Sequence, residues 1–211
     1  MLIYRRLFFD HVKTNVTIYL FITTLLITGI VFGAIIVNSM SFVQKQDLFF
    51  HVNQFFAKIN NQEPIMSKDI LKKSFLFHLQ YLILILLLGL TIIGIPLIWL
   101  LIFSKGLVIG FSVGFIVNQL GLKGLLLATV SIAPQNMIII PIYIIAASLA
   151  NLFSLLLFQK IMSRSVSTSM GRPFMQYMTV YGLLIVAALF GSLIETFIAY
   201  EAVKVTIQRF T

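Results

Sequence analysis

The chain has 211 residues, of which 60% are hydrophobic and only 10% carry a charged side chain. Soluble domains carry about 25% charged residues, and a soluble fold of this size could not bury so much apolar surface. Composition therefore excludes a soluble monomer and predicts an integral membrane protein. The net charge of +9 does not indicate a nucleic-acid-binding protein, because the basic residues are scattered and form no block of five or more. Cysteine is absent, which excludes disulfides and thiolate metal sites.

Five apolar runs, uncharged except for Glu195 in the last, predict five membrane-spanning helices in a single membrane domain covering residues 1–211. About 20 helical residues cross the hydrocarbon core of a bilayer, and the first run is too long for a signal-peptide core. Gly94 and Pro96 fall inside the second run and predict a kink there. We therefore expect an all-α, polytopic helical bundle with spans at residues 16–37, 79–103, 106–122, 137–158 and 177–200.

The uncharged run at residues 124–158 is too long for one crossing. Its 35 residues would measure about 52 Å as a continuous helix. Ala133, Pro134, Gln135 and Asn136 are the obvious place for a break. We expect a Pro-broken helix near residue 134, with residues 124–133 forming a half-helix or an interfacial helix before the fourth span.

The long loop at residues 38–78 contains an amphipathic helix at residues 44–59, which we expect on the membrane surface or on the bundle. Five spans place the two termini on opposite sides. The basic residues divide almost evenly between the sides when this loop is counted, but long segments translocate with less regard for charge. We therefore expect a cytoplasmic N-terminus, an exterior loop and an exterior C-terminus. The apolar positions of the loop helix form a candidate partner surface: Leu48, Phe49, Val52, Phe55 and Phe56.

Residues for catalysis or metal binding are sparse. There is no phosphate-binding loop, no nucleophile elbow and no zinc-ligand spacing among His11, His51 and His78. We expect these histidines to be polar tips at the membrane interface. Glu195 is the one carboxylate inside an apolar run, and intramembrane acids prompt a functional hypothesis. Either it reaches the interface as a helix cap, or it couples to transport or to a partner.

Small residues and amides give two further patterns. Glycines recur at four-residue spacing in the first and third spans, at Gly29, Gly33, Gly106, Gly110 and Gly114. Such strips allow close backbone approach between helices, either within the protein or in a homo-oligomer or partner interface.

Polar and Pro residues cluster around the predicted break, at Asn118, Gln119, Pro134, Gln135, Asn136 and Pro141. Buried amides need hydrogen-bond partners, and these two amide pairs either bond each other or form a substrate or ion site.

Several segments together resemble the stage II sporulation protein M family of endospore-forming bacteria. The similarity covers most of the chain, and the segments that carry it are residues 32–39, 44–48, 54–56, 105–119, 131–141 and 194–197. A wider family of related membrane proteins often shows Pro-His-Gly-x-x-Glu-x-Pro where this chain runs from Pro134 to Pro141. Here Gln135 and Ile139 replace the His and the Glu, a departure that fits the sporulation branch.

The resemblance implies a role in engulfment of the forespore. The family member is a polytopic scaffold in the septal membrane of the mother cell. It holds a lytic transglycosylase (stage II sporulation protein D) and an amidase/endopeptidase (stage II sporulation protein P), which remodel septal peptidoglycan. We therefore expect a non-enzymatic scaffold without cofactors, whose partners are these hydrolases and the bilayer. The alternative from another class is a small-molecule transporter or permease subunit.

Overall fold

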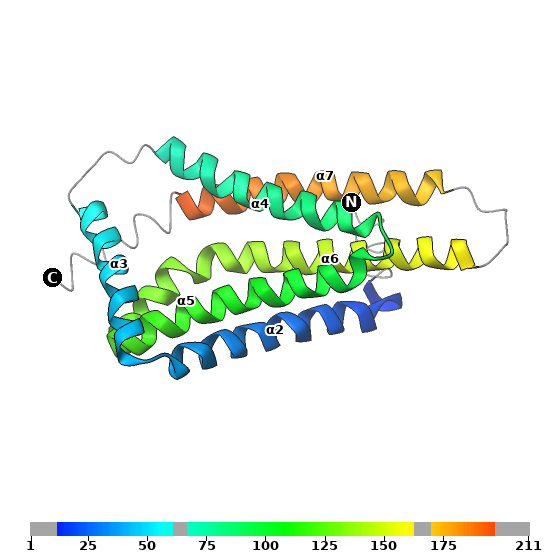
Figure 1. Cartoon of the computed structure of the whole chain (residues 1–211). Coiled ribbons are helices and arrows are strands. Elements are labelled where there is room, and N and C mark those ends of the chain that lie inside the picture. The colour runs from blue at the N-terminus through cyan, green and yellow to red at the C-terminus, as the bar shows by residue number, and fades with distance from the viewer. Residues whose placement is uncertain (1–11, 61–66, 163–169, 197–211) are drawn as a thin grey trace.

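The computed structural model describes residues 12–60, 67–162 and 170–196, and this part of the chain is helical throughout apart from short turns. The all-α prediction is confirmed. The helices, labelled as in Figure 1, are α2 (Val16–Ser39), α3 (Phe42–Asn60), α4 (Ser67–Gly89), α5 (Gly94–Ser131), α6 (Ala133–Met162) and α7 (Gly171–Ile194).

Five helices of the described part are long and apolar enough to cross a membrane, which confirms a multi-pass bundle. They are Val16–Ser39, Leu71–Gly89, Gly94–Val130, Ala133–Met162 and Gly171–Ile194. The first and fourth correspond to predicted spans with shifted ends. The fifth begins at Gly171 instead of residue 177, and residues 197–200 of its predicted span lie outside the described residues. The second and third predicted spans do not match the helices. Part of the predicted exterior loop is also helix, since α4 begins at Ser67.

The predicted kinked span at residues 79–103 is wrong, because the chain reverses direction between α4 and α5. Thr91 closes the turn, with its hydroxyl donating to the Leu88 carbonyl at 2.9 Å. A Cβ at Gly94 would collide with that same carbonyl, so the turn requires glycine. Pro96 then lies in the first turn of α5, where its missing N–H costs no intrahelical hydrogen bond. These two residues begin a helix instead of bending one.

The predicted third span at residues 106–122 is the continuation of α5, which runs without interruption through Lys105. Gly121 has φ 58°, outside the helical region, and separates the last ten residues of α5 from the rest. The predicted break near residue 134 is confirmed, since α5 ends at Ser131 and α6 begins at Ala133. Pro134 occupies the first turn of α6, where proline is favoured.

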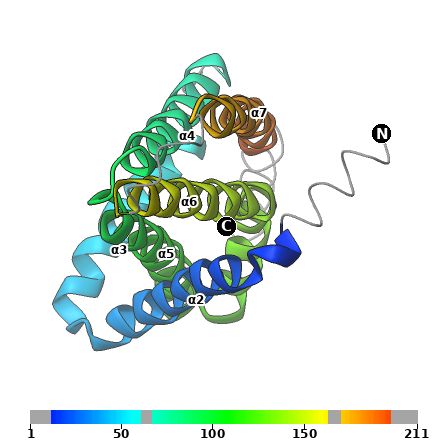
Figure 2. The same cartoon turned by 90° about the vertical axis from the view of Figure 1, so that its right-hand side faces the viewer.

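The five long helices lie side by side, with α2, α5 and α7 running one way and α4 and α6 the other (Figure 1). Helix α6 occupies the middle of the bundle, as the end-on view shows (Figure 2). Its alanines Ala146, Ala147 and Ala150 are fully buried, and their small side chains let the neighbouring helices approach closely. Helix α3 lies across one end of the bundle instead of along it (Figures 1 and 2).

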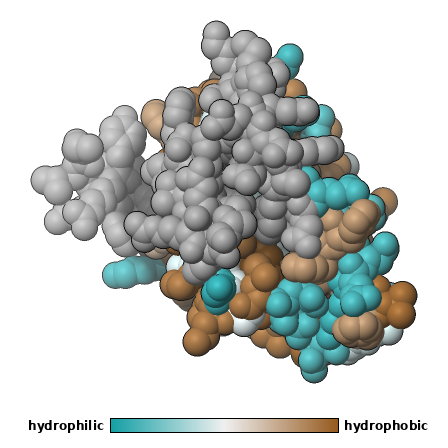
Figure 3. Space-filling view, turned by 90° about the vertical axis from the view of Figure 1, so that its left-hand side faces the viewer, coloured by the Kyte–Doolittle hydropathy of each residue, from teal (hydrophilic) through white to brown (hydrophobic). Residues whose placement is uncertain are grey.

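The end of the bundle that carries α3 has a mixed surface. Seen from that end, hydrophilic side chains gather on the side where α3 lies, and hydrophobic ones line its outer edge (Figure 3). We refer to this as the α3 end. The turn between α4 and α5 lies at the opposite end (Figure 1).

Candidate functional site

Helices α2 and α5 meet along a glycine seam, which consists of Gly29, Gly33, Gly106 and Gly110. A Cβ at Gly29 would collide with the Phe103 carbonyl, and one at Gly110 would collide with the Ile30 carbonyl. Gly114 continues the line, since its added Cβ would lie 3.2 Å from the Ala34 Cα. The glycines therefore lie where the backbones of two helices of the same chain touch.

A polar cluster lies between α4, α5, α6 and α7, towards the α3 end. It consists of Ser74, His78, Lys105, Gln135, Tyr143 and Glu195. Glu195 follows the last residue of α7. Its carboxylate accepts a hydrogen bond from the Ser74 hydroxyl of α4. Gln135 of α6 faces the same carboxylate. When its amide is oriented with the nitrogen towards Glu195, that nitrogen donates to both carboxylate oxygens, each at 2.9 Å.

His78 connects the carboxylate to the interior of the bundle. Its Nε2 lies 3.6 Å from the Glu195 carboxylate, and its Nδ1 lies 2.7 Å from the Tyr143 hydroxyl. His78 is 6% exposed and Tyr143 is 0% exposed. The prediction that His78 is a polar tip at the interface is therefore wrong. It failed because the second span was predicted to begin at residue 79, whereas α4 begins at Ser67 and already contains His78.

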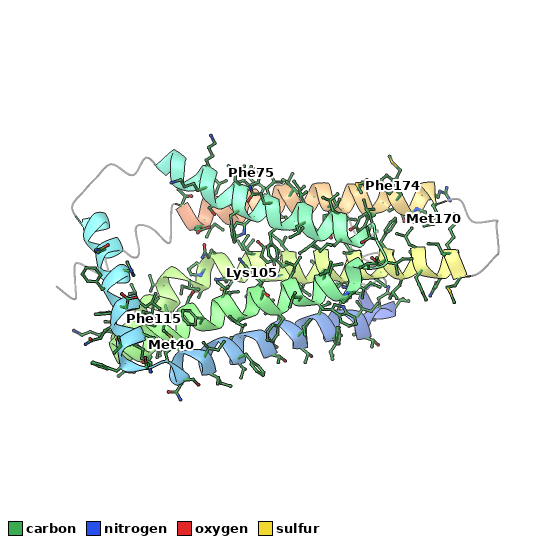
Figure 4. The ribbon with its side chains drawn as sticks, viewed as in Figure 1. Met40, Phe75, Lys105, Phe115, Met170 and Phe174 are labelled. Atoms are coloured by element: carbon green, nitrogen blue, oxygen red, sulfur yellow. The ribbon has the colours of Figure 1, made fainter. Side chains whose placement is uncertain are left out.

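Lys105 supplies the positive charge of the cluster. Its Nζ lies 5.0 Å from the ring centre of Phe77, 5.2 Å from that of Tyr143 and 5.7 Å from that of Tyr81. These distances are within the range of cation–π attraction, and the ammonium also interacts electrostatically with Glu195. Figure 4 shows Lys105 in the body of the bundle. The predicted spans at residues 79–103 and 106–122 left Lys105 between them, whereas it lies within α5.

The arrangement satisfies its hydroxyl, imidazole and carboxylate groups and binds helices together. Ser74 donates to Glu195, so its hydroxyl joins α4 to the end of α7. In the described residues, no group of three His, Asp or Glu side chains could hold a metal ion. A paired and hydrogen-bonded acid at this depth stabilises one arrangement of α4, α6 and α7.

The amides near the break have partners other than each other. Gln119 donates to the neighbouring Asn118 at 3.5 Å, while Asn136 donates to the Ile132 carbonyl at 2.7 Å. Gln135 faces Glu195 instead. Pro141 lies inside α6. The two amide pairs are therefore used separately, one beside Gly121 and one at the start of α6.

A second set of polar contacts stabilises the opposite end. The Ser154 hydroxyl lies 2.8 Å from both the Gly89 and the Thr91 carbonyls at the α4–α5 turn. Trp99 donates to Asn151 at 2.9 Å. Tyr177 donates to the Leu86 carbonyl, one turn before the end of α4, at 3.0 Å. These hydrogen bonds hold the α4–α5 turn against α6 and α7, although the turn lies in an apolar run and contains no charged residue.

Helix α3 begins with a capping box directly after α2. The Ser41 N–H donates to the Gln44 side chain at 2.9 Å, and the Gln44 N–H donates back to the Ser41 hydroxyl at 3.4 Å. The predicted helix at residues 44–59 is confirmed. Of the candidate partner residues, Leu48 and Phe49 are half-buried. The side chains of Val52, Phe55 and Phe56 lie outside the described residues.

Sequence reasoning missed most of the polar cluster, although one signal was readable. Ser74, His78 and Tyr81 are spaced by four and three residues, which places them on one face of α4. That polar stripe enters an otherwise apolar span. Lys105 gave no comparable signal, since its nearest neighbours in the cluster, His78 and Gln135, are 27 and 30 residues away in sequence.

The fold and these contacts define a polytopic α-helical membrane protein whose helices are joined by buried polar groups. The family model described as stage II sporulation protein M matches residues 22–200. The chain therefore belongs to this family and is a sporulation membrane protein. No curated protein and no solved structure matched the chain in the corresponding comparisons.

Proposed function

We propose that the chain is a non-catalytic scaffold that assembles peptidoglycan hydrolases at the sporulation septum during engulfment of the forespore. The observation that carries this proposal is the family match over residues 22–200. The polar cluster supports it, because its hydroxyl, imidazole and carboxylate are used to join helices. The family match does not favour the transporter alternative.

The partners in this proposal are a lytic transglycosylase and an amidase/endopeptidase, the stage II sporulation proteins D and P. Their substrate is the cell wall, so the surface that holds them must face the exterior. With a cytoplasmic N-terminus, the α3 end faces the exterior, because α2 runs from the other end towards α3 (Figure 1). Lys13, Lys160 and Arg172 then lie on the cytoplasmic side, and the lysines of α3 and of the start of α4 lie on the exterior side, in a long segment that translocates with less regard for charge.

The docking surface within this proposal is the exposed polar side of α3. Gln44, Asp47, His51 and Gln54 recur at three- and four-residue spacing and are all exposed, so they form one stripe of the helix. Leu48 and Phe49 are half-buried and are less available for contact. The stripe begins close to α2, because the Ser41–Gln44 capping box starts α3 directly after that helix.

The scaffold role is tested by deletion in the source organism, followed with a membrane dye through sporulation. We expect a septum that bulges or stays flat without engulfment, and restoration by the intact chain. Normal engulfment in the deletion strain would rule the proposal out.

The docking surface is tested separately by Gln54→Arg, with Gln176→Arg as the matched control. Gln176 is exposed near the start of α7, at the opposite end of the bundle. Co-purification of the hydrolases at equal expression should fall for Gln54→Arg and stay unchanged for Gln176→Arg. Equal recovery with both variants would remove α3 from the partner surface while leaving the scaffold role intact.

A further inference from the structure

Lys105 differs from the rest of the polar cluster, because its ammonium has no hydrogen-bond acceptor in the part of the chain that the structure describes. Its described neighbours are three aromatic faces, from Phe77, Tyr81 and Tyr143. Glu195 attracts the ammonium electrostatically, but the two groups are not in salt-bridge contact. Within the described residues, the three N–H donors of this charge are therefore not hydrogen-bonded.

Lys105 lies near the middle of the membrane. Its neighbour Gly106 packs against α2, where an added Cβ would meet the Leu26 carbonyl. Leu26 is ten residues from the start and eleven from the end of the apolar run at residues 16–37. The hydrocarbon core of a bilayer is about 30 Å thick, so lipid phosphates lie about 15 Å from this level on either side. A lipid headgroup therefore does not reach an ammonium that is held among three rings at this depth.

A single exposed ring covers the ammonium on the outer side of the bundle. Phe77 of α4 is 55% exposed, and its ring centre lies 5.0 Å from the Lys105 Nζ. Val108, three residues after Lys105 on α5, is 57% exposed. Helices α4 and α5 meet at their turn and separate towards the α3 end (Figure 1), and Lys105 lies between them (Figure 4). We name this side, with Phe77 and Val108, the α4–α5 edge.

We propose that the α4–α5 edge binds a transmembrane helix of another protein, one that carries a carboxylate near its middle. An ionised side chain within the hydrocarbon core pairs with a group of opposite charge, and ammonium donors bind a carboxylate more strongly than a neutral acceptor. Rotation of the Phe77 side chain opens the way from the membrane to Lys105. The carboxylate of the partner then accepts the hydrogen bonds that Lys105 does not make within the described residues. This proposal goes beyond the scaffold role, because it identifies the chemistry of a partner inside the membrane.

The test uses designed peptides as the partner. Three synthetic leucine–alanine helices of about 23 residues, long enough to span a bilayer, differ only in their central residue, which is Glu, Gln or Lys. The chain has no cysteine, so Val108→Cys places one fluorescent label at the α4–α5 edge of the full chain. Leu183→Cys is the matched control on α7, where Leu183 is 66% exposed. Energy transfer to a dye on the peptide reports binding in phosphatidylcholine vesicles.

With the label at position 108, the Glu peptide should reach half-maximal transfer at about one tenth of the peptide-to-lipid ratio that the Gln peptide needs, a difference that polar pairs between membrane helices reach in model peptides. The Lys peptide should bind no better than the Gln peptide. Lys105→Met should abolish the preference for Glu, and Lys105→Arg should keep it.

Equal binding of the Glu and Gln peptides to the chain with Lys105 intact would overturn the proposal, whether or not the Lys105→Met variant folds. A preference for Glu that persists in Lys105→Met would overturn it as well. So would equal transfer to the labels at positions 108 and 183, since that result places the peptide elsewhere on the bundle. None of these outcomes depends on the hydrolases or on α3, so the scaffold role stands or falls separately.

Discussion

The two halves of the bundle are held together in opposite ways. The glycine seam between α2 and α5 brings two backbones into contact, with Gly110 of α5 against the Ile30 carbonyl of α2. The polar cluster between α4, α6 and α7 instead uses side chains that reach across, from Ser74, Gln135 and His78 to Glu195. Lipid provides no hydrophobic drive between helices, so close packing and buried hydrogen bonds are the available means. The glycine seam relies on close packing, and the polar cluster relies on buried hydrogen bonds.

This difference predicts different sensitivities. The seam cannot accept added atoms, whereas the cluster cannot lose a hydrogen-bonding group without leaving its partners unsatisfied. Substitutions that fill space should damage the first region, and substitutions that remove polarity should damage the second. The four predictions below test this contrast, in order of decreasing effect.

The largest effect is expected for Gly110→Leu. The added side chain begins where the Ile30 carbonyl already lies, so α2 and α5 must separate. Overpacking costs about 1–3 kcal/mol when side chains can move, and a main-chain obstacle places this variant at or above the upper end. Thermal unfolding in detergent measures the loss. Gly182→Leu is the control, because a Cβ at Gly182 meets nothing within 4 Å. If both variants unfold at the same temperature, the seam is not a tight contact.

The next effect is expected for Glu195→Leu. This change removes the acceptor for Ser74 and Gln135 and leaves His78 without the carboxylate. An unsatisfied buried donor costs about 1–3 kcal/mol, and the part-exposed position of Glu195 limits the total to about 2–3 kcal/mol. Glu195→Gln keeps an acceptor oxygen and should lose less stability. Equal losses for Leu and Gln would show that hydrogen bonding at this position contributes little.

A smaller effect is expected in the double-substitution cycle of Glu195→Gln and Lys105→Met. Each single change leaves one charge in the cluster without its opposite, while the pair of changes removes both. The double variant should therefore be more stable than the sum of the single losses predicts, by about 1–2 kcal/mol. Unfolding of all four proteins under one set of conditions gives this coupling. A value of zero means that the aromatic rings alone stabilise the lysine.

The smallest effect is expected for Ser154→Ala at the opposite end. Its hydroxyl lies 2.8 Å from the Gly89 and Thr91 carbonyls of the α4–α5 turn, and a neutral hydrogen bond contributes about 1 kcal/mol. Thr179→Val is the control, since that hydroxyl donates to the Met175 carbonyl of its own helix. Unfolding temperatures should fall for Ser154→Ala only. A matching fall for Thr179→Val would contradict a special role at the turn.

Apolar runs and glycine spacing predicted parts of the fold correctly because they are local patterns in the sequence. The number of spans, the break before α6 and the positions of the seam glycines follow from residues close together in sequence. The helix boundaries near Gly94 and Lys105 could not be predicted from the sequence. A proline that follows a glycine is compatible both with a kink and with the first turn of a new helix. Sequence alone does not distinguish these two structures.

The sequence by itself determined the class of protein, five apolar helices and a helical segment between the first two. These follow from the transfer of apolar residues out of water and from the length needed to cross a bilayer. Only the tertiary structure decided that Glu195, His78 and Lys105 share one cluster. Residues 78, 105 and 195 come from three different helices. A charge within a span is tolerated only where other helices supply its partners, and the packing of those helices decides where that is.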